Sequence, residues 1–204
     1  MKKLYFFISI LTIFCGMGNI YAQVGAEISY IGPVGYPAYF FKPSLGLEVK
    51  WLSGDEDSKI CACMSIGYYS FKPTQDTFPT ITVASGGMNA LLPGHEVIKT
   101  YAVVPIGFGA EYRPLETKLS PVIGLMGYFY VIDLAYHSDV QTLIDEDSES
   151  AEWELAVMPK LGLSYKLSDN WLLSASLGYS LGITGTVDTQ SYWKTSIGVM
   201  YIPD

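Results

Sequence analysis

Apolar residues alternate with small or polar residues along most of this chain, and the segment 100–114 shows the pattern most strictly. Its two faces are Ala102, Val104, Ile106, Phe108, Ala110 and Tyr112 and, opposite them, Tyr101, Val103, Pro105, Gly107, Gly109, Glu111 and Arg113. A period of two is typical of a β-strand with two different faces. The alternation recurs without a convincing amphipathic helix between the repeats. It predicts eight strands, over 24–31, 43–53, 59–72, 99–113, 119–133, 152–167, 170–184 and 191–202.

The connections between these strands alternate in length. The segments 54–58, 114–118 and 168–169 are short and polar, 32–42, 73–98 and 134–151 are long, and 185–190 is intermediate. Outer-membrane barrels have short periplasmic turns at one end and long external loops at the other. The sequence therefore predicts an all-β fold, an eight-stranded antiparallel up-and-down transmembrane β-barrel with both termini at the periplasmic end.

The composition of the two faces indicates which of them meets lipid. The strand expected at 170–184 carries Trp, Leu, Ala and Tyr on one side and mostly Ser and Gly on the other. Charged residues make up only 16% of the chain and are concentrated in turns and loops, so the second face would be an unusually uncharged surface for a soluble protein. We therefore expect the apolar face to meet lipid. The alternative is a soluble, exported barrel of the lipocalin type, whose apolar faces would line an internal cavity.

The N-terminal segment predicts export. Lys2 and Lys3 precede an apolar run over 4–14, and the stretch ending at Ala22 suits cleavage by signal peptidase. The run is shorter than the ~20 residues that a spanning helix needs. We expect a signal peptide at 1–22 and a barrel domain at 23–204, located in the outer membrane of a Gram-negative cell. Cleavage changes 12 basic and 20 acidic residues to 10 and 20, a net charge of −10, which argues against nucleic acid as a partner.

Aromatic residues of the apolar face are expected near both membrane boundaries, where such residues form girdles. One predicted girdle, at the periplasmic side, is Trp51, Tyr112, Tyr165, Trp171 and Tyr201, and the other is Tyr30, Tyr68, Trp153, Tyr179 and Trp193.

Charged residues of both signs are expected inside the barrel. The inward positions include Glu27, Glu48, Lys50, Glu111, Arg113, Glu154, Lys160, Lys166 and Lys194. Eight strands leave an interior just wide enough for side chains or one small ligand, so these charges have to pair with one another. A paired network of this kind predicts a plugged barrel and argues against a general diffusion pore.

Few residues suggest chemistry. The run His137-Ser138-Asp139 has the residue types of a lipid A-modifying hydrolase, but adjacent loop residues do not make a triad, so we expect no enzyme. Cys61 and Cys63 share one strand face at the limit of disulfide geometry, and free thiols are expected. A metal site at these cysteines would need further ligands, and His95 and His137 fall in loops remote in sequence, so no metal and no cofactor is expected.

The expected loop at 134–151 contains an acidic run that continues to Glu152. It has two interpretations, a solvated loop or a site for Ca²⁺, which could also bridge the protein to lipopolysaccharide. The acidic residues are Asp145, Glu146, Asp147, Glu149 and Glu152.

Three stretches carry a resemblance to a known family. They are PIGFGAEYR (105–113), PVIGLMGYFY (121–130) and KLGLSYKLSDNWLLSASLGYSLG (160–182), which resemble the strands and hairpins of small Bacteroidota-type outer-membrane β-barrel domains, the PorT/OmpX-like group. The resemblance implies an eight-stranded barrel in the outer membrane without a cofactor. The chain departs from the pattern in ending on Pro203-Asp204 instead of a terminal aromatic residue. We expect a structural or surface-binding role through the long loops, with outer-membrane lipid, lipopolysaccharide and envelope or surface proteins as partners.

Overall fold

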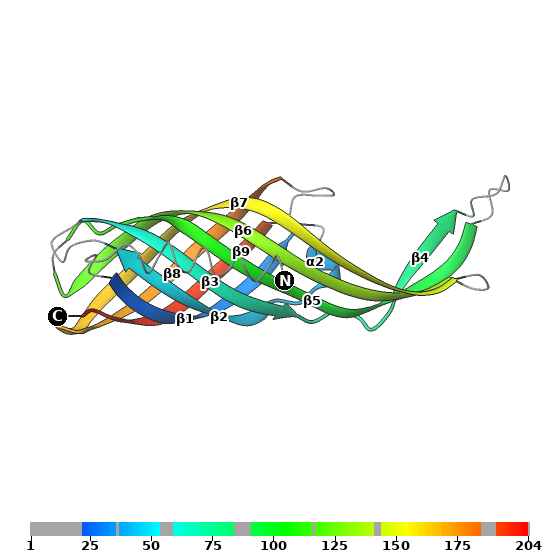
Figure 1. Cartoon of the computed structure of the whole chain (residues 1–204), viewed down its shortest axis with the longest axis horizontal. Helices are drawn as coiled ribbons and strands as arrows, with labels where there is room; N and C mark the ends of the chain where they lie inside the picture. Colours follow the sequence, from blue (N-terminus) through cyan, green and yellow to red (C-terminus); the bar gives the residue numbers. More distant parts are fainter. Residues whose placement is uncertain are drawn as a thin grey trace, which may run out of the picture.

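Eight antiparallel strands close into a barrel in the computed structural model (Figure 1). The structure describes residues 22–35, 37–53, 59–83, 91–115, 117–140, 144–184 and 191–203, except for the side chains of 22, 79–83, 91–96, 98–100, 136–140 and 144–151. The barrel strands are β1 (Ala22–Val34), β2 (Ser44–Ser53), β3 (Ile60–Phe71), β5 (Leu91–Tyr112), β6 (Leu119–Val140), β7 (Ile144–Ser168), β8 (Trp171–Thr184) and β9 (Ser191–Tyr201).

Each barrel strand pairs with its neighbours in the chain, and two further pairings close the ring. β1 pairs with β9, and β3 pairs with β5 across the short strand β4 (Phe78–Val83). Ala22 of β1 lies opposite Ser53 of β2, and Tyr201 of β9 lies opposite Trp171 of β8. The first strand therefore begins, and the last strand ends, at the rim of the barrel that carries the short turns. The predicted eight-stranded up-and-down topology is confirmed.

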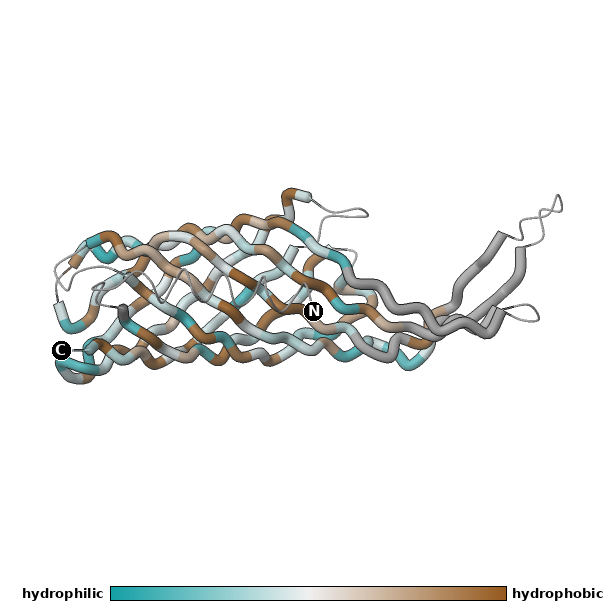
Figure 2. The backbone as a smooth tube through the Cα atoms, in the orientation of Figure 1, coloured by the Kyte–Doolittle hydropathy of each residue, from teal (hydrophilic) through white to brown (hydrophobic). Residues whose placement is uncertain are grey.

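The barrel is apolar outside and polar inside. Leu45 is 68% exposed and Phe108 is 46% exposed on the outer face, whereas Tyr101 and Glu111, on the other side of the 100–114 segment, are buried. Figure 2 shows the same alternation of hydrophobic and hydrophilic residues along the strands. Such an arrangement suits a barrel surrounded by lipid. It rules out the lipocalin interpretation, because the apolar faces lie outside and do not line a cavity.

Three strands run well past the rest of the barrel, which corrects the expected loops. The segments 73–98 and 134–151 were expected to be long loops, but β4 and parts of β5, β6 and β7 fall within them. Beyond the end of β3 at Phe71 and of β8 at Thr184, these strands continue as a four-stranded extension that projects from the barrel (Figure 1). We call this extension the protruding sheet. It consists of β4, 91–100 of β5, 134–140 of β6 and 144–150 of β7.

A β-bulge marks the base of the protruding sheet. Ile98 lies opposite Tyr136 and Thr100 lies opposite Ala135, so Lys99 is one extra residue in β5. A one-residue bulge exchanges the two faces of a strand. In the barrel part of β5, over 101–111, odd-numbered residues occupy the inner face. In the protruding sheet, over 92–98, even-numbered residues occupy the continuation of that face.

Helical structure in the described part of the chain is limited to the short α2 (Pro37–Phe40) between β1 and β2. None of the helical residues described forms a segment long and apolar enough to cross a membrane.

Candidate functional site

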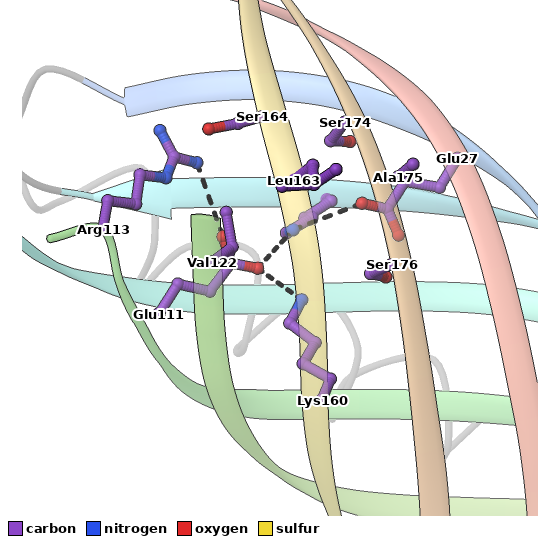
Figure 3. Close-up of a pocket in the computed structure, with 11 residues that line it drawn as sticks. Glu27, Glu111, Arg113, Val122, Lys160, Leu163, Ser164, Ser174, Ala175 and Ser176 are labelled. Atoms are coloured by element: carbon purple, nitrogen blue, oxygen red, sulfur yellow. Dashed lines mark hydrogen bonds and ion pairs between the residues drawn. The ribbon is translucent and has the colours of Figure 1, made fainter. Parts of the chain in front are cut away.

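The first cluster of interior charges centres on Glu111, near the short-turn end of the barrel. The Glu111 carboxylate forms ion pairs with Lys50 of β2, with Lys160 of β7 and with Arg113, whose Nη2 lies 3.4 Å from Oε2. Lys50 also pairs with Glu27 of β1, Nζ to Oε1 3.2 Å. Figure 3 shows the side chains of Glu27, Glu111, Arg113 and Lys160 pointing toward one another in the barrel interior. The strict alternation of each strand brings them inside, and the closed register brings them together.

A second cluster lies farther from the short turns and centres on Glu48. Its carboxylate pairs with Lys194 of β9 and accepts hydrogen bonds from the Tyr69 hydroxyl and from Ser29 Oγ, the latter at 3.3 Å. The Lys194 ammonium also donates to the Tyr128 hydroxyl oxygen at 3.5 Å. Glu48 and Glu111 are almost fully buried, and carboxylates at this depth persist only when they are paired. Within each cluster, the opposite charges therefore stabilise one another in the barrel interior.

Aromatic rings fill the interior at the end nearest the protruding sheet. The hydroxyls of Tyr101 and Tyr192 lie 2.9 Å apart, and the Tyr130 hydroxyl donates to Ser180 Oγ at 2.9 Å. Phe41 stacks on Tyr101 with ring centroids 3.9 Å apart. The sequence predicted aromatic residues only for the girdles, so this interior layer of aromatic rings was not expected. The available signal was that Tyr101, Tyr130 and Tyr192 share the alternation phase of the inward charges.

The segment after α2 is tied to the end of β3, which seats Phe41 over the interior. Phe41 forms an isolated bridge with Pro73, and the Lys42 amide donates to the Lys72 carbonyl at 2.8 Å. Thr74 Oγ1 donates to the Tyr39 carbonyl at 2.6 Å. The connection between β1 and β2, expected to be a long loop, thus covers the barrel interior at the end nearest the protruding sheet.

Little free space remains inside the barrel. A cavity lined by Glu27, Lys50, Glu111 and Lys160 measures about 10 Å³, room for roughly one water molecule. At Gly107, an added Cβ atom would lie 2.6 Å from Ser65 Oγ and 2.7 Å from a Tyr128 ring carbon. Glycine at this inward position makes space for the Tyr128 ring, so the described interior is tightly packed around Tyr128.

Two predicted interior residues lie apart from the two clusters. Glu154 of β7 is buried on the inner face, opposite Tyr130 in the register. Lys166 forms an ion pair with the exposed Asp169 in the β7–β8 turn, Nζ to Oδ1 3.3 Å. The prediction of free thiols is confirmed, because Cys61 and Cys63 are unbridged; both are buried in the interior, and Cys63 Sγ lies 3.9 Å from Glu111 Oε1.

The aromatic residues predicted for the girdles lie on the outer face in two bands. Trp171 and Tyr201 have ring centroids 5.4 Å apart at the short-turn end, and Tyr30 and Trp193 have theirs 5.2 Å apart toward the other end. The first band also holds Trp51, Tyr112 and Tyr165, and the second also holds Tyr68, Trp153 and Tyr179.

The residues suspected of chemistry lie in strands of the protruding sheet, which corrects their assignment to loops. His137, Ser138 and Asp139 are consecutive in β6, so Ser138 is on the opposite face from the other two and the three do not form a triad. His95 of β5 lies opposite Asp139, so the two histidines are not remote from each other. Among the residues whose side chains are described, no cluster of three His, Cys, Asp or Glu is arranged to hold a metal ion.

Comparison with solved structures identifies the fold. Neisserial surface protein A superposes with a TM-score of 0.58 at 16% identity, over 89% of this chain and 97% of that protein. A major outer membrane protein from Thermus thermophilus has a TM-score of 0.53 at 11% identity, over 88% and 98% of the two chains. The chain has the fold of outer-membrane β-barrels. The outer membrane protein OprG of Pseudomonas aeruginosa agrees, with a TM-score of 0.51 at 12% identity over 88% and 94%. No family model matches the sequence, and no curated protein matches it either.

Proposed function

We propose that the protein is an outer-membrane barrel that holds the protruding sheet outside the cell, where the sheet binds an extended segment of another polypeptide. The observation that carries the proposal is the free edge of β4 in a sheet that projects from a plugged barrel. β4 pairs with β5, and in the described part of the chain no strand pairs with its other edge. An unpaired edge is a template for an added strand, and strand addition is a common mode of peptide recognition.

The two edges of the protruding sheet differ in charge, which favours β4 as the binding edge. β4 reads FPTITV and has no charged residue. The opposite edge, 144–150 of β7, reads IDEDSES and has four acidic residues. Charged side chains protect an edge from pairing, whereas an uncharged, β-branched strand accepts a partner. The partner is therefore an extended polypeptide segment that adds to β4, and the acidic edge of β7 stays unpaired.

Placement in the outer membrane rests on the outer surface of the barrel. The apolar outer face and the two aromatic bands match the lipid-facing surface of such barrels. We infer a cleaved signal peptide at 1–22, a barrel domain from 23 onward, contact with lipid and lipopolysaccharide, and membership of the PorT/OmpX-like group on the sequence resemblance. We infer neither catalysis nor a diffusion pore, because the described interior is filled by ion pairs and aromatic rings.

Site-specific photo-crosslinking on intact cells tests the proposal. A photoreactive amino acid at Thr80 in β4 should give a discrete adduct with a partner polypeptide, and the same group at Asp169 in the β7–β8 turn should not. The combined changes Thr82→Lys and Val83→Lys should remove the adduct, because lysine on an edge blocks strand addition. The matched control Ser150→Lys, on the acidic edge of β7, should keep it. Absence of an adduct from Thr80, or an adduct that survives the two lysines on β4, contradicts the proposal.

A further inference from the structure

The cavity in the barrel interior lies beside the first charge cluster and has a charged side and a hydroxyl side. The charged residues that line it are Glu27, Lys50, Glu111, Arg113 and Lys160. The uncharged polar residues that line it are Ser164 of β7 and Ser174 and Ser176 of β8 (Figure 3). At about 10 Å³, the cavity has room for roughly one particle of the size of a water molecule. The charge and the size of the cavity therefore determine what it can hold.

The charges that line the cavity do not cancel. Three of the five charged residues are cations and two are anions, so the lining has one positive charge in excess. The second cluster does not supply the missing anion, because the Glu48 carboxylate pairs with Lys194 of its own cluster. Buried charges are stable only when opposite charges offset them. The lining is therefore one negative charge short of balance.

Arg113 contributes a buried donor that its ion pair does not use. Its Nη2 pairs with Glu111 at 3.4 Å, whereas its Nε is buried and has no hydrogen-bond partner among the described residues. A buried N–H group without an acceptor costs free energy comparable to a lost hydrogen bond. Of the charged side chains that line the cavity, that of Arg113 is the most exposed, at 14%. Solvent therefore reaches the cavity lining at the same residue that carries the unused donor.

The hydroxyl side of the cavity offers a second donor. Ser176 Oγ lies 2.7 Å from Ser196 Oγ, and either hydroxyl can be the donor of that hydrogen bond. When Ser196 donates, the hydroxyl hydrogen of Ser176 is free for a ligand. Ser164 and Ser174 instead donate to backbone carbonyls. Among the three lining serines, Ser176 is therefore the one whose hydroxyl can turn to a ligand without losing its own hydrogen bond.

These features fit a small monovalent anion. A cation would add to a lining that already has excess positive charge. Water alone satisfies hydrogen bonds but leaves the excess charge uncompensated. Phosphate and sulfate are too large for a volume of about one water molecule. A monatomic anion such as chloride brings one negative charge into that volume and accepts hydrogen bonds from N–H and O–H donors.

We propose that the cavity binds one chloride ion, held by the cations Lys160 and Arg113 and by the hydroxyl of Ser176. The ion supplies the charge that the lining lacks and an acceptor for Arg113 Nε. It links the end of β5 with β7 and β8 and so stabilises the closed ring at the short-turn end of the barrel. The site lies inside the barrel and is independent of the proposed polypeptide binding at β4.

Urea unfolding from lipid vesicles in sodium chloride and in the same concentration of sodium gluconate tests the site, because gluconate is too large for the cavity. A ligand that binds only the folded state favours that state, and we expect the unfolding equilibrium constant to be at least about tenfold smaller in chloride. Arg113→Gln balances the lining and removes the unused donor, so the difference between the two salts should vanish. Ser176→Val, which leaves every charge in place, should reduce the difference severalfold. The matched control is Lys59→Gln, which removes an exposed positive charge next to the backbone of Arg113 and should keep the full difference.

Broadening of the chloride NMR signal by the refolded chain in detergent micelles reports binding without unfolding. Wild type and Lys59→Gln should broaden the signal, and Arg113→Gln should not. Heat-dependent migration on gels verifies that each variant is folded. If Arg113→Gln does not fold, an undiminished chloride effect in Ser176→Val overturns the site.

Two further outcomes would overturn it. Equal unfolding constants of the wild type in the two salts, without broadening of the chloride signal, would mean that the cavity holds water only. A chloride effect that survives Arg113→Gln, or that disappears with Lys59→Gln, would be a general effect of salt on surface charge. Because these assays need no polypeptide partner, their result does not depend on the crosslinking experiment.

Discussion

Replacement of Glu111 by glutamine removes the charge at the centre of the first interior cluster and keeps the shape of the side chain. Glu111 is 1% exposed and forms ion pairs with three cations, Lys50, Lys160 and Arg113. We expect Glu111→Gln to destabilise the folded barrel, because buried cations then lose their counter-charge while water cannot replace it.

The expected loss of stability depends on which ion pairs each of the three cations keeps after the change. Lys50 keeps its ion pair with Glu27, and Arg113 is the most exposed of the three side chains. Lys160 is 9% exposed, and within the described residues its ion pair is with Glu111 alone. The change therefore leaves about one buried ammonium group, that of Lys160, without its counter-charge. Breaking a buried ion pair on one side costs about 3–5 kcal/mol, which is the expected fall in the free energy of unfolding.

Reversible urea unfolding from lipid vesicles, followed by tryptophan fluorescence, measures this difference. The double variant Glu111→Gln, Lys160→Met should recover much of the loss, because it removes both charges of the pair. The matched control is Lys166→Gln, whose ion pair with Asp169 lies at the surface. Exposed pairs contribute about 0–1 kcal/mol, so this control should unfold nearly as the wild type does. If Glu111→Gln loses no more than Lys166→Gln, or if the double variant loses as much as the two single changes added, the interior network does not hold the barrel together.

Three further predictions concern the faces and the interior of the barrel. Phe108→Arg, on the outer face, should cost roughly 2–4 kcal/mol near the bilayer midplane and reduce refolding into vesicles, and wild-type refolding of this variant would disprove the lipid-facing assignment. Gly107→Ser should lower the free energy of unfolding by about 1–3 kcal/mol, because its Cβ would lie 2.6 Å from Ser65 Oγ; an unchanged value would mean that the interior has room. The wild-type barrel in planar bilayers should show no steady conductance, since ion pairs and aromatic rings fill its described interior, and a stable open channel would contradict that packing.

The alternation of apolar with small or polar residues was enough to predict the barrel from the sequence. Each strand has one face toward the interior and one toward the outside, so the pattern around Phe108 and Glu111 reports both the strand and the side of each residue. It predicted inward positions for Glu111 and Lys160, which are buried in the structure, but did not tell which of the inward charges meet. The pairing of Glu111 with Lys160 joins β5 to β7, strands that are not neighbours, and depends on the closed register of the whole ring.

The protruding sheet was missed for two physical reasons. The acidic run at 145–149 lacks an apolar face, so its strand has no alternation to detect. In β5, the bulge at Lys99 exchanges the faces and interrupts the pattern at the point where the strand leaves the barrel. The interior tyrosines were missed because tyrosine suits a membrane boundary and a packed polar interior equally well.

Thiol labelling of intact cells tests most directly whether the barrel holds the protruding sheet outside the cell. In a background with Cys61→Ser and Cys63→Ser, one variant has Ser85→Cys, between β4 and β5, and the other has Asp169→Cys in the β7–β8 turn. A membrane-impermeant maleimide should label Ser85→Cys on intact cells and should label Asp169→Cys only after the outer membrane is opened. Labelling of Asp169→Cys but not Ser85→Cys on intact cells would place the protruding sheet in the periplasm and contradict the account.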